Sequence, residues 1–146
     1  MKNLLVAVDL QGGGDQTLLD HAEMLAAKFD SKVWIVHVAA PDPDFVGFDA
    51  GPVYIRKTLA DDLRQEHKTL QQYAVNLCNK NINAESLMVQ GPTVQTIYDE
   101  AAKLKTDMLI MGSHKHNFLE RVFGQDTIRQ IYDKSQIPML IIPLNE

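Results

Sequence analysis

Apolar residues along the chain gather in short runs that alternate with longer amphipathic segments. Five of these runs are short and rich in leucine and β-branched residues, and they are therefore predicted to be strands. They cover Leu4–Asp9, Lys32–Ala39, Glu85–Gly91, Thr106–Gly112 and Met139–Leu144. A cluster of glycines follows the first run closely and ends it. The pattern therefore predicts five strands with other structure between them.

Between the strands, apolar residues recur at every third or fourth position, which is the spacing of one face of an α-helix. The markers of four helices, in chain order, are Leu18, Ala22, Leu25 and Phe29; Ile55, Leu59, Leu63, Leu70, Ala74 and Leu77; Val94, Ile97, Tyr98 and Ala101; and Ile128, Ile131 and Tyr132. Asp15 stands where it can cap the first helix. Pro92 lies near the start of the third helix, where a missing backbone donor costs little.

Near-continuous apolar strands separated by helices are typical of a parallel sheet that is covered on both faces. Each return to a parallel neighbour needs a crossover, and such crossovers are right-handed. We therefore predict a doubly wound, Rossmann-like α/β fold with five parallel strands. The expected strand order is 3-2-1-4-5, the common one for such a sheet.

Length and composition indicate one compact domain, since the chain has 146 residues and 45% of them are apolar. No internal repeat, low-complexity tract or linker divides the sequence. We therefore expect a single domain over residues 1–146, with Pro41–Pro52 as an excursion from it. The apolar run at the N-terminus is too short for a signal peptide or a membrane span, which predicts a cytoplasmic protein.

The net charge of −5 argues against a broad basic surface. We therefore expect no nucleic acid and no membrane among the partners, although a local cationic loop can still bind phosphate. The single cysteine, Cys78, cannot form an internal disulfide and has no activating pattern near it in the sequence. We interpret Cys78 as a buried or idle thiol.

Topology indicates where a ligand would bind. In open α/β sheets the crevice forms beyond the carboxyl ends of the strands, where the strand order reverses. With the order 3-2-1-4-5, Asp9 and Gly112 face the same crevice. Backbone amides from Gly112 onward, and the start of the last helix after Gly124, are placed to donate hydrogen bonds to phosphate. Asp9 is placed to accept hydrogen bonds from ribose hydroxyls.

The stretches VAVDL, IVHV, DMLIMGSH and PMLIIP together resemble the universal stress protein family, and the resemblance spans nearly the whole chain. It implies a five-stranded fold of the adenine nucleotide alpha hydrolase-like type and a homodimer formed through the last strand, Met139 to Leu144. One branch of the family binds ATP or AMP through a loop written G-x-x-G, nine residues, then G-[ST]. By this resemblance Asp9 holds the adenosine, and the backbone around Val38 meets the adenine.

The loop after the fourth strand matches the family motif in part. Gly112, Ser113 and Gly124 agree with it. Lys115 stands where the motif has its second glycine, and Gln125 replaces the hydroxyl residue. The loop is also shorter than the motif, so the chain looks closer to a shorter-loop ATP-binding branch, in which a basic residue follows a Ser-His pair.

The departures from the motif leave polar groups in the loop. Lys115 is a compact cation suited to phosphate, and Gln125 keeps a hydrogen-bond donor. The residues proposed to hold the nucleotide are Asp9, Val38, Gly112, Ser113, His114, Lys115, Arg121, Gly124 and Gln125.

Each of these residues also has a plainer interpretation. In that interpretation Asp9 is only a turn residue, and the glycines only mark the end of a strand and the start of a helix. Lys115 and Arg121 are then surface charges. His114 and His116 lack a third ligand nearby, so we predict no metal bound by the protein. Ser113 beside His114 has no legible acid or oxyanion site, so we do not predict a hydrolase. His37 is expected to pack within the sheet.

Two further functional classes stay open. A phosphate-accepting receiver domain needs an acidic pocket, of which only Asp9 is in place, because Gln90 and Gly91 end the third strand. A family member that has lost nucleotide and acts only through protein partners is the stronger alternative, and Lys115 and Gln125 favour it.

The sequence thus predicts a cytoplasmic stress-response protein that binds ATP or AMP, with or without Mg²⁺, between the first and fourth strands. It is expected to act as a dimeric sensor or interaction module. We expect no enzymatic activity beyond slow ATP hydrolysis.

Overall fold

The computed structural model describes residues 1–10, 13–39, 53–114 and 125–144. In these ranges strands and helices alternate along the chain. The strands are β1 (Asn3–Ala7), β2 (Lys32–Ala39), β3 (Ala84–Gln90), β4 (Met108–His114) and β5 (Met139–Leu144). The helices are α1 (Asp15–Phe29), α3 (Val53–Cys78), α4 (Thr93–Lys103) and α5 (Gln125–Lys134). The excursion predicted at Pro41–Pro52 lies outside the described residues.

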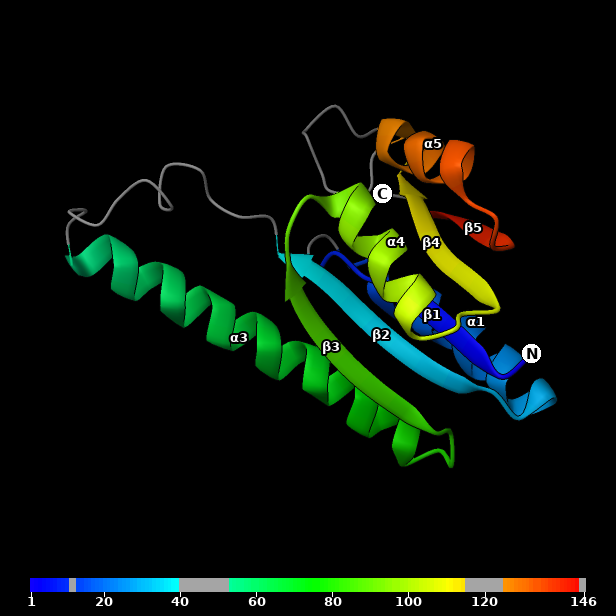
Figure 1. Ribbon diagram of the computed structural model, residues 1–146. Helices are drawn as coiled ribbons and strands as arrows, with labels where there is room; N and C mark the ends of the chain where they lie inside the picture. Colours follow the sequence, from blue (N-terminus) through cyan, green and yellow to red (C-terminus); the bar gives the residue numbers. More distant parts are fainter. Residues whose placement is uncertain (11–12, 40–52, 115–124, 145–146) are drawn as a thin grey trace.

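The five strands form one parallel sheet in the order β3-β2-β1-β4-β5 (Figure 1). β1 lies at the centre. From it the chain moves outward to β2 and β3, and then returns to the other side of β1 to form β4 and β5. The strand order therefore reverses at β1. The predicted fold class and strand order are confirmed.

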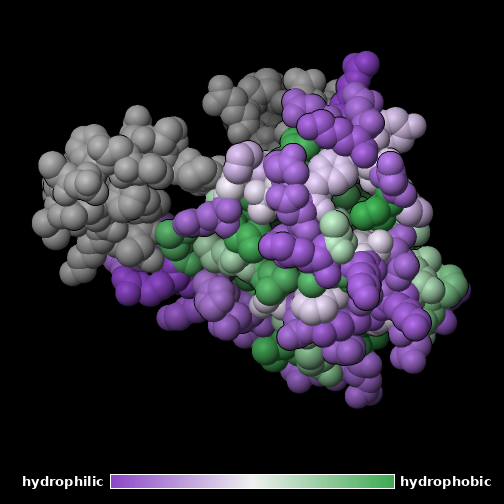
Figure 2. Space-filling model, viewed as in Figure 1, coloured by the Kyte–Doolittle hydropathy of each residue, from purple (hydrophilic) through white to green (hydrophobic). Residues whose placement is uncertain are grey.

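Helices cover both faces of this sheet. On one face α1 and α3 pack against Leu4 and Val6 of β1, and on the other α4 and α5 pack with Leu5 and Ala7. Both sets of alternate residues are apolar because both faces are buried. The face of the molecule seen in Figure 2 is mostly hydrophilic, with apolar areas between polar side chains. Among the described residues, no helix combines the length and the apolar character that a membrane span requires.

The buried face of α1 differs from the predicted one. Leu18 and Ala22 are buried as expected, but Leu19 and Ala26 complete the face. Phe29, the last residue of the helix, is 51% exposed. Ala22 and Ala26 are small and allow the helix to approach the sheet closely. The buried face of α1 is therefore centred on these alanines and not on the larger Phe29.

Three local predictions are corrected. Tyr132, expected in the apolar stripe of α5, is 69% exposed. Cys78, interpreted as a buried or idle thiol, is not buried: the residue is exposed, with its Sγ 3.4 Å from the carbonyl oxygen of Ala84. Asp15 does not cap α1 as expected: the cap position is Gly14, and Asp15 is the first helical residue.

The fourth strand begins and ends two residues later than predicted. It does not end at Gly112, because pairing with β5 continues to His114. Gly112 lies opposite Ile142, and His114 lies opposite Leu144. The last residues of β4 therefore keep strand geometry at the carboxyl edge of the sheet.

The side chain of Leu144 occupies space between two glycines. A Cβ added at Gly112 would lie 2.5 Å from Leu144 Cδ1, and a Cβ at Gly14 would meet the same atom. Leu144 is buried, so it has little room to move. A side chain at position 112 would therefore require Leu144 to shift.

We predict that Gly112→Ala lowers the free energy of unfolding by about 1–3 kcal/mol, the usual cost of overpacking a core. Urea unfolding measures the loss. In the double variant Gly112→Ala/Leu144→Ala the new methyl group enters the space that the leucine leaves, so the combined loss should be smaller than the sum of the two single losses. Additive losses would show that Leu144 does not limit this position.

Candidate functional site

The register of the sheet brings three of the predicted site residues to one level. Val6 of β1 pairs with Ile110 of β4 and with Ile35 of β2. Three residues further along, Asp9 follows the end of β1, Ser113 lies in β4 and Val38 lies in β2. Because the strands are parallel and adjacent, these positions lie together at the carboxyl edge, with Asp9 in the middle.

Burial limits what each of these residues offers to a ligand. Asp9 is 5% exposed and Ser113 is half-buried. The side chain of Val38 is 1% exposed and packs into the core under α4 and α5, so only its backbone can face the crevice. The carboxyl edge of the sheet thus combines a nearly buried carboxylate with backbone groups of the flanking strands.

The remaining predicted residues are placed only in part. Gly112 and His114 lie in β4, where the backbone pairs with β5. Gln125 is the first residue of α5. Lys115, Arg121 and Gly124 lie outside the described residues.

A second carboxylate, Asp15, lies beside Asp9. It is 5% exposed, and its Oδ2 accepts a hydrogen bond from the backbone N–H of Leu10 at 3.1 Å and another from the Tyr73 hydroxyl at 3.0 Å. Leu10 itself has a φ of 61°, in the left-handed region. The turn after β1 is therefore held by a side chain from α1 that is anchored on α3.

The surroundings of Asp15 disfavour the charged form of its carboxyl. Burial raises the pKa of Asp15 above its ordinary value of 3.8, and the charge of Asp9 raises it further. The hydrogen bonds from Tyr73 and from the backbone of Asp9 and Leu10 lower the pKa, but they do not cancel the increase. Burial also raises the pKa of the Tyr73 hydroxyl, and the charge of Asp15 adds to that shift.

His37 forms a second polar contact next to Asp9. It packs within the sheet as predicted and is buried. Its Nδ1 lies 3.0 Å from the carbonyl oxygen of Val8, and its Nε2 lies 2.8 Å from Oε2 of Glu66 on α3. A carbonyl oxygen only accepts, so Nδ1 carries the hydrogen of this contact, and Nε2 faces the carboxylate of Glu66.

Sequence reasoning missed the partners Tyr73 and Glu66. They are distant from Asp15 and His37 in the chain, so no local spacing reveals the contacts. One signal was present: the buried face of α3 contains Leu70, and Glu66 and Tyr73 stand one helical turn before and after it. Polar groups at core-facing positions indicate that they have polar partners.

No three histidine, cysteine, aspartate or glutamate side chains in the described ranges come together in a group that could hold a metal ion. His116, the second half of the histidine pair noted in the sequence, lies outside those ranges.

We predict that Asp15→Asn raises the melting temperature at neutral pH by about 2–4 °C, the shift that roughly 1 kcal/mol causes in a chain of this size. The raised pKa means that folding favours the protonated carboxyl. The contribution of Asp15 to stability is therefore largest below pH 3.8 and is lost as the pH rises through its folded-state pKa. Thermal unfolding should accordingly show the advantage of the variant shrinking as the pH falls.

Asp107→Asn is the matched control. The backbone N–H groups of Asn3 and Lys2 donate to Asp107 at 2.8 and 2.7 Å, and they lower the pKa of its carboxyl. Neutralising Asp107 should therefore reduce stability at neutral pH, opposite in sign to the change at Asp15. The same sign for both variants would contradict this electrostatic description.

Comparison with known proteins agrees with the fold and the resemblance. The model of the Universal stress protein family matches residues 1–143. Universal stress protein MJ0531 of Methanocaldococcus jannaschii is 24% identical over 145 residues, which cover 97% of this chain and 81% of that protein.

Two solved structures have the same fold at low sequence identity. The universal stress protein from Archaeoglobus fulgidus in complex with dAMP has a TM-score of 0.68 at 16% identity, covering 97% of this chain and 98% of that one. A universal stress protein in complex with cAMP has a TM-score of 0.68 at 16% identity, covering 97% and 96%.

Proposed function

Because the chain belongs to the universal stress protein family, we propose that it binds an adenine nucleotide, ATP or AMP, at the carboxyl ends of β1, β2 and β4. The observation that carries the proposal is the sheet register, which sets Asp9 level with Val38 and Ser113. A carboxylate flanked by two strand backbones suits a ribose on one side and a base or phosphate on the other. The crystallised relatives that hold dAMP and cAMP lend support to adenine as the base.

Each residue has a chemical role in this proposal. The carboxylate of Asp9 accepts hydrogen bonds from the ribose hydroxyls, and the backbone of Val38 faces the adenine. Amides from Gly112 onward donate to the phosphate oxygens, together with the start of α5. His114, Lys115, Arg121, Gly124 and Gln125 belong to the proposed phosphate side of the site.

Two carboxylates are buried beside each other at this edge, which costs stability and favours a binding site over a purely structural role. Asp9 and Asp15 are both 5% exposed, and burial and the charge of Asp9 raise the pKa of Asp15. Burying a carboxylate beside another costs stability, and groups with a perturbed pKa, as Asp15 has, cluster at functional sites. This observation ranks nucleotide binding above the alternative of a module that has lost its ligand.

The receiver-domain alternative does not fit the sheet. Receiver domains of the CheY type have the strand order 2-1-3-4-5. The order here is β3-β2-β1-β4-β5.

The proposed cellular role is that of a cytoplasmic stress-response protein that senses the nucleotide or presents it to partners, with slow ATP hydrolysis at most.

We predict that the purified protein binds ATP or AMP in calorimetric titration, and that Asp9→Asn weakens the binding about 10-fold to 100-fold, as expected for loss of a charged hydrogen-bond acceptor. Asp107→Asn removes a carboxylate at the opposite edge of the sheet and should leave the affinity unchanged. Absence of adenine nucleotide binding in the unaltered protein would overturn the proposal in favour of the interaction module.

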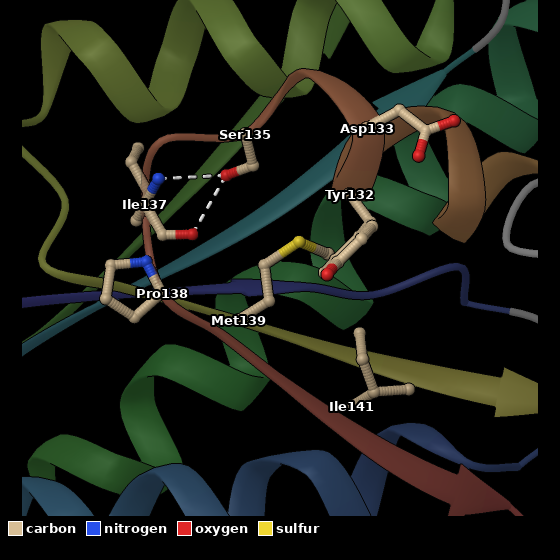
Figure 3. Close-up of a pocket in the computed structure, with 7 residues that line it drawn as sticks. All are labelled: Tyr132, Asp133, Ser135, Ile137, Pro138, Met139 and Ile141. Carbon is tan, nitrogen blue, oxygen red and sulfur yellow. Dashed lines mark hydrogen bonds between the residues drawn. The ribbon is translucent and has the colours of Figure 1, made fainter.

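Dimerisation is a second, separate proposal, with Met139–Leu144 as the contact. β5 is an edge strand, so one side of its backbone has no neighbouring strand in the described sheet. A hollow of about 470 Å³ adjoins it, lined by residues from α5, from the α5–β5 connection and from β5 itself (Figure 3). Met139 and Ile141 of β5 and the exposed Tyr132 of α5 give this hollow an apolar part. A second copy related by two-fold symmetry would pair its own β5 there and cover these side chains.

Sedimentation at micromolar concentration tests the dimer, and we predict that Ile141→Asp converts it to a monomer, because a charge would be buried between the two copies. Val75→Asp places the same charge on an exposed position of α3 and should leave the dimer intact. A monomeric unaltered protein, or dimers of equal stability in both variants, would exclude the β5 contact.

A further inference from the structure

The main chain after Asp9 is held in a conformation that it does not favour by itself. Leu10 has a φ of 61°, and a non-glycine residue in the left-handed region costs about 1 kcal/mol or more. Such strain persists where the surroundings impose it, and here the Leu10 N–H is bonded to Asp15. Asp15 in turn is bonded to Tyr73. We call this chain of contacts, from α3 to Leu10, the Tyr73 relay.

The main chain before Asp9 is held from the same helix. The carbonyl of Val8 lies just beyond the end of β1 and accepts a hydrogen bond from His37. The other ring nitrogen of His37 faces Glu66 of α3. We call this second chain of contacts the Glu66 relay.

The two relays start from one face of one helix. Glu66 and Tyr73 are seven residues apart, which is close to two turns of α-helix. Leu70, midway between them, is fully buried against the sheet. α3 is therefore linked to the backbone on both sides of Asp9 indirectly, through Asp15 on one side and His37 on the other.

We propose that Tyr73 and Glu66 are positioning residues which, through Asp15 and His37, fix the main chain on both sides of Asp9 and so aim its carboxylate at the ligand. This inference rests on the proposed nucleotide site at Asp9. It assigns α3, which contributes none of the predicted ligand contacts, a part in setting the affinity.

The Tyr73 relay gives binding a dependence on pH. Asp15 is faced by Asp9 from the end of β1 and by Tyr73 from α3, and the His37–Glu66 pair is the next polar contact between β2 and α3. A protonated carboxyl is a weaker acceptor for the Leu10 N–H than a carboxylate. Affinity should therefore fall as the pH drops through the pKa of Asp15. Because the Tyr73 hydrogen bond lowers that pKa, its removal should shift the fall to higher pH.

Calorimetric titration with AMP over a pH series tests the proposal on the full chain. We expect Tyr73→Phe to weaken AMP binding about threefold to tenfold, the effect of one lost hydrogen bond, and to move the pH step upward. Glu66→Gln should weaken binding to a similar degree. Asp15→Asn keeps an acceptor oxygen but does not titrate, so its affinity should lack the step.

Tyr98→Phe is the matched control. It also removes a tyrosine hydroxyl with a hydrogen bond, from Tyr98 to the Ile131 carbonyl at 2.5 Å, but it lies between α4 and α5. Its AMP affinity and pH profile should equal those of the unaltered protein. Equal losses in the two phenylalanine variants, a Glu66→Gln variant of unaltered affinity, or a pH step retained in Asp15→Asn, would overturn the positioning role.

A measurement without ligand separates this inference from the proposed function. The Leu10 amide resonance should follow the titration of Asp15, with a midpoint that rises in Tyr73→Phe and a step that disappears in Asp15→Asn. If the unaltered protein does not bind AMP, the proposed function fails and this titration still decides the relay. An unmoved midpoint in Tyr73→Phe would refute it.

Discussion

Parallel pairing of β1 with both β2 and β4 is the constraint on which the rest of the molecule depends. All five strands point the same way, so their carboxyl ends share one edge, and the strand order reverses at β1, which is where open α/β sheets bind their ligands. The helices that return the chain cover both faces and remove them from water. The edge beyond β1 is thus where polar side chains of several elements can meet.

The polar groups at that edge work against stability. Two carboxylates are buried side by side, a leucine is held in the left-handed region, and a buried imidazole lies against the carboxylate of Glu66 on α3. A continuous apolar core would avoid each of these features. Their concentration around Asp9, beside a sheet whose interior is otherwise apolar, is the pattern expected where function has overridden stability.

The fold was predictable because its signals are periodic and local. The alternation of apolar runs and helical stripes predicted all five strands. Their order was expected only because it is the common one for such a sheet, and that order placed Asp9 beside the end of β4. The network around Asp15 was not predictable, because Tyr73 lies 58 residues away and nothing local links them. The exposure of Phe29 and Tyr132 was missed because periodicity describes a helix face, whereas burial depends on what the face meets.

The most direct test of the central claim is a map of backbone amide chemical shifts on adding AMP to the isotope-labelled full chain. A ligand at the carboxyl edge of β1 and β4 should produce its largest changes at Asp9, Leu10, Val38, Gly112 and Ser113. Changes confined to the hollow beside Tyr132 and Met139, or no saturable change at all, would contradict the claim that the crevice at β1 is the site.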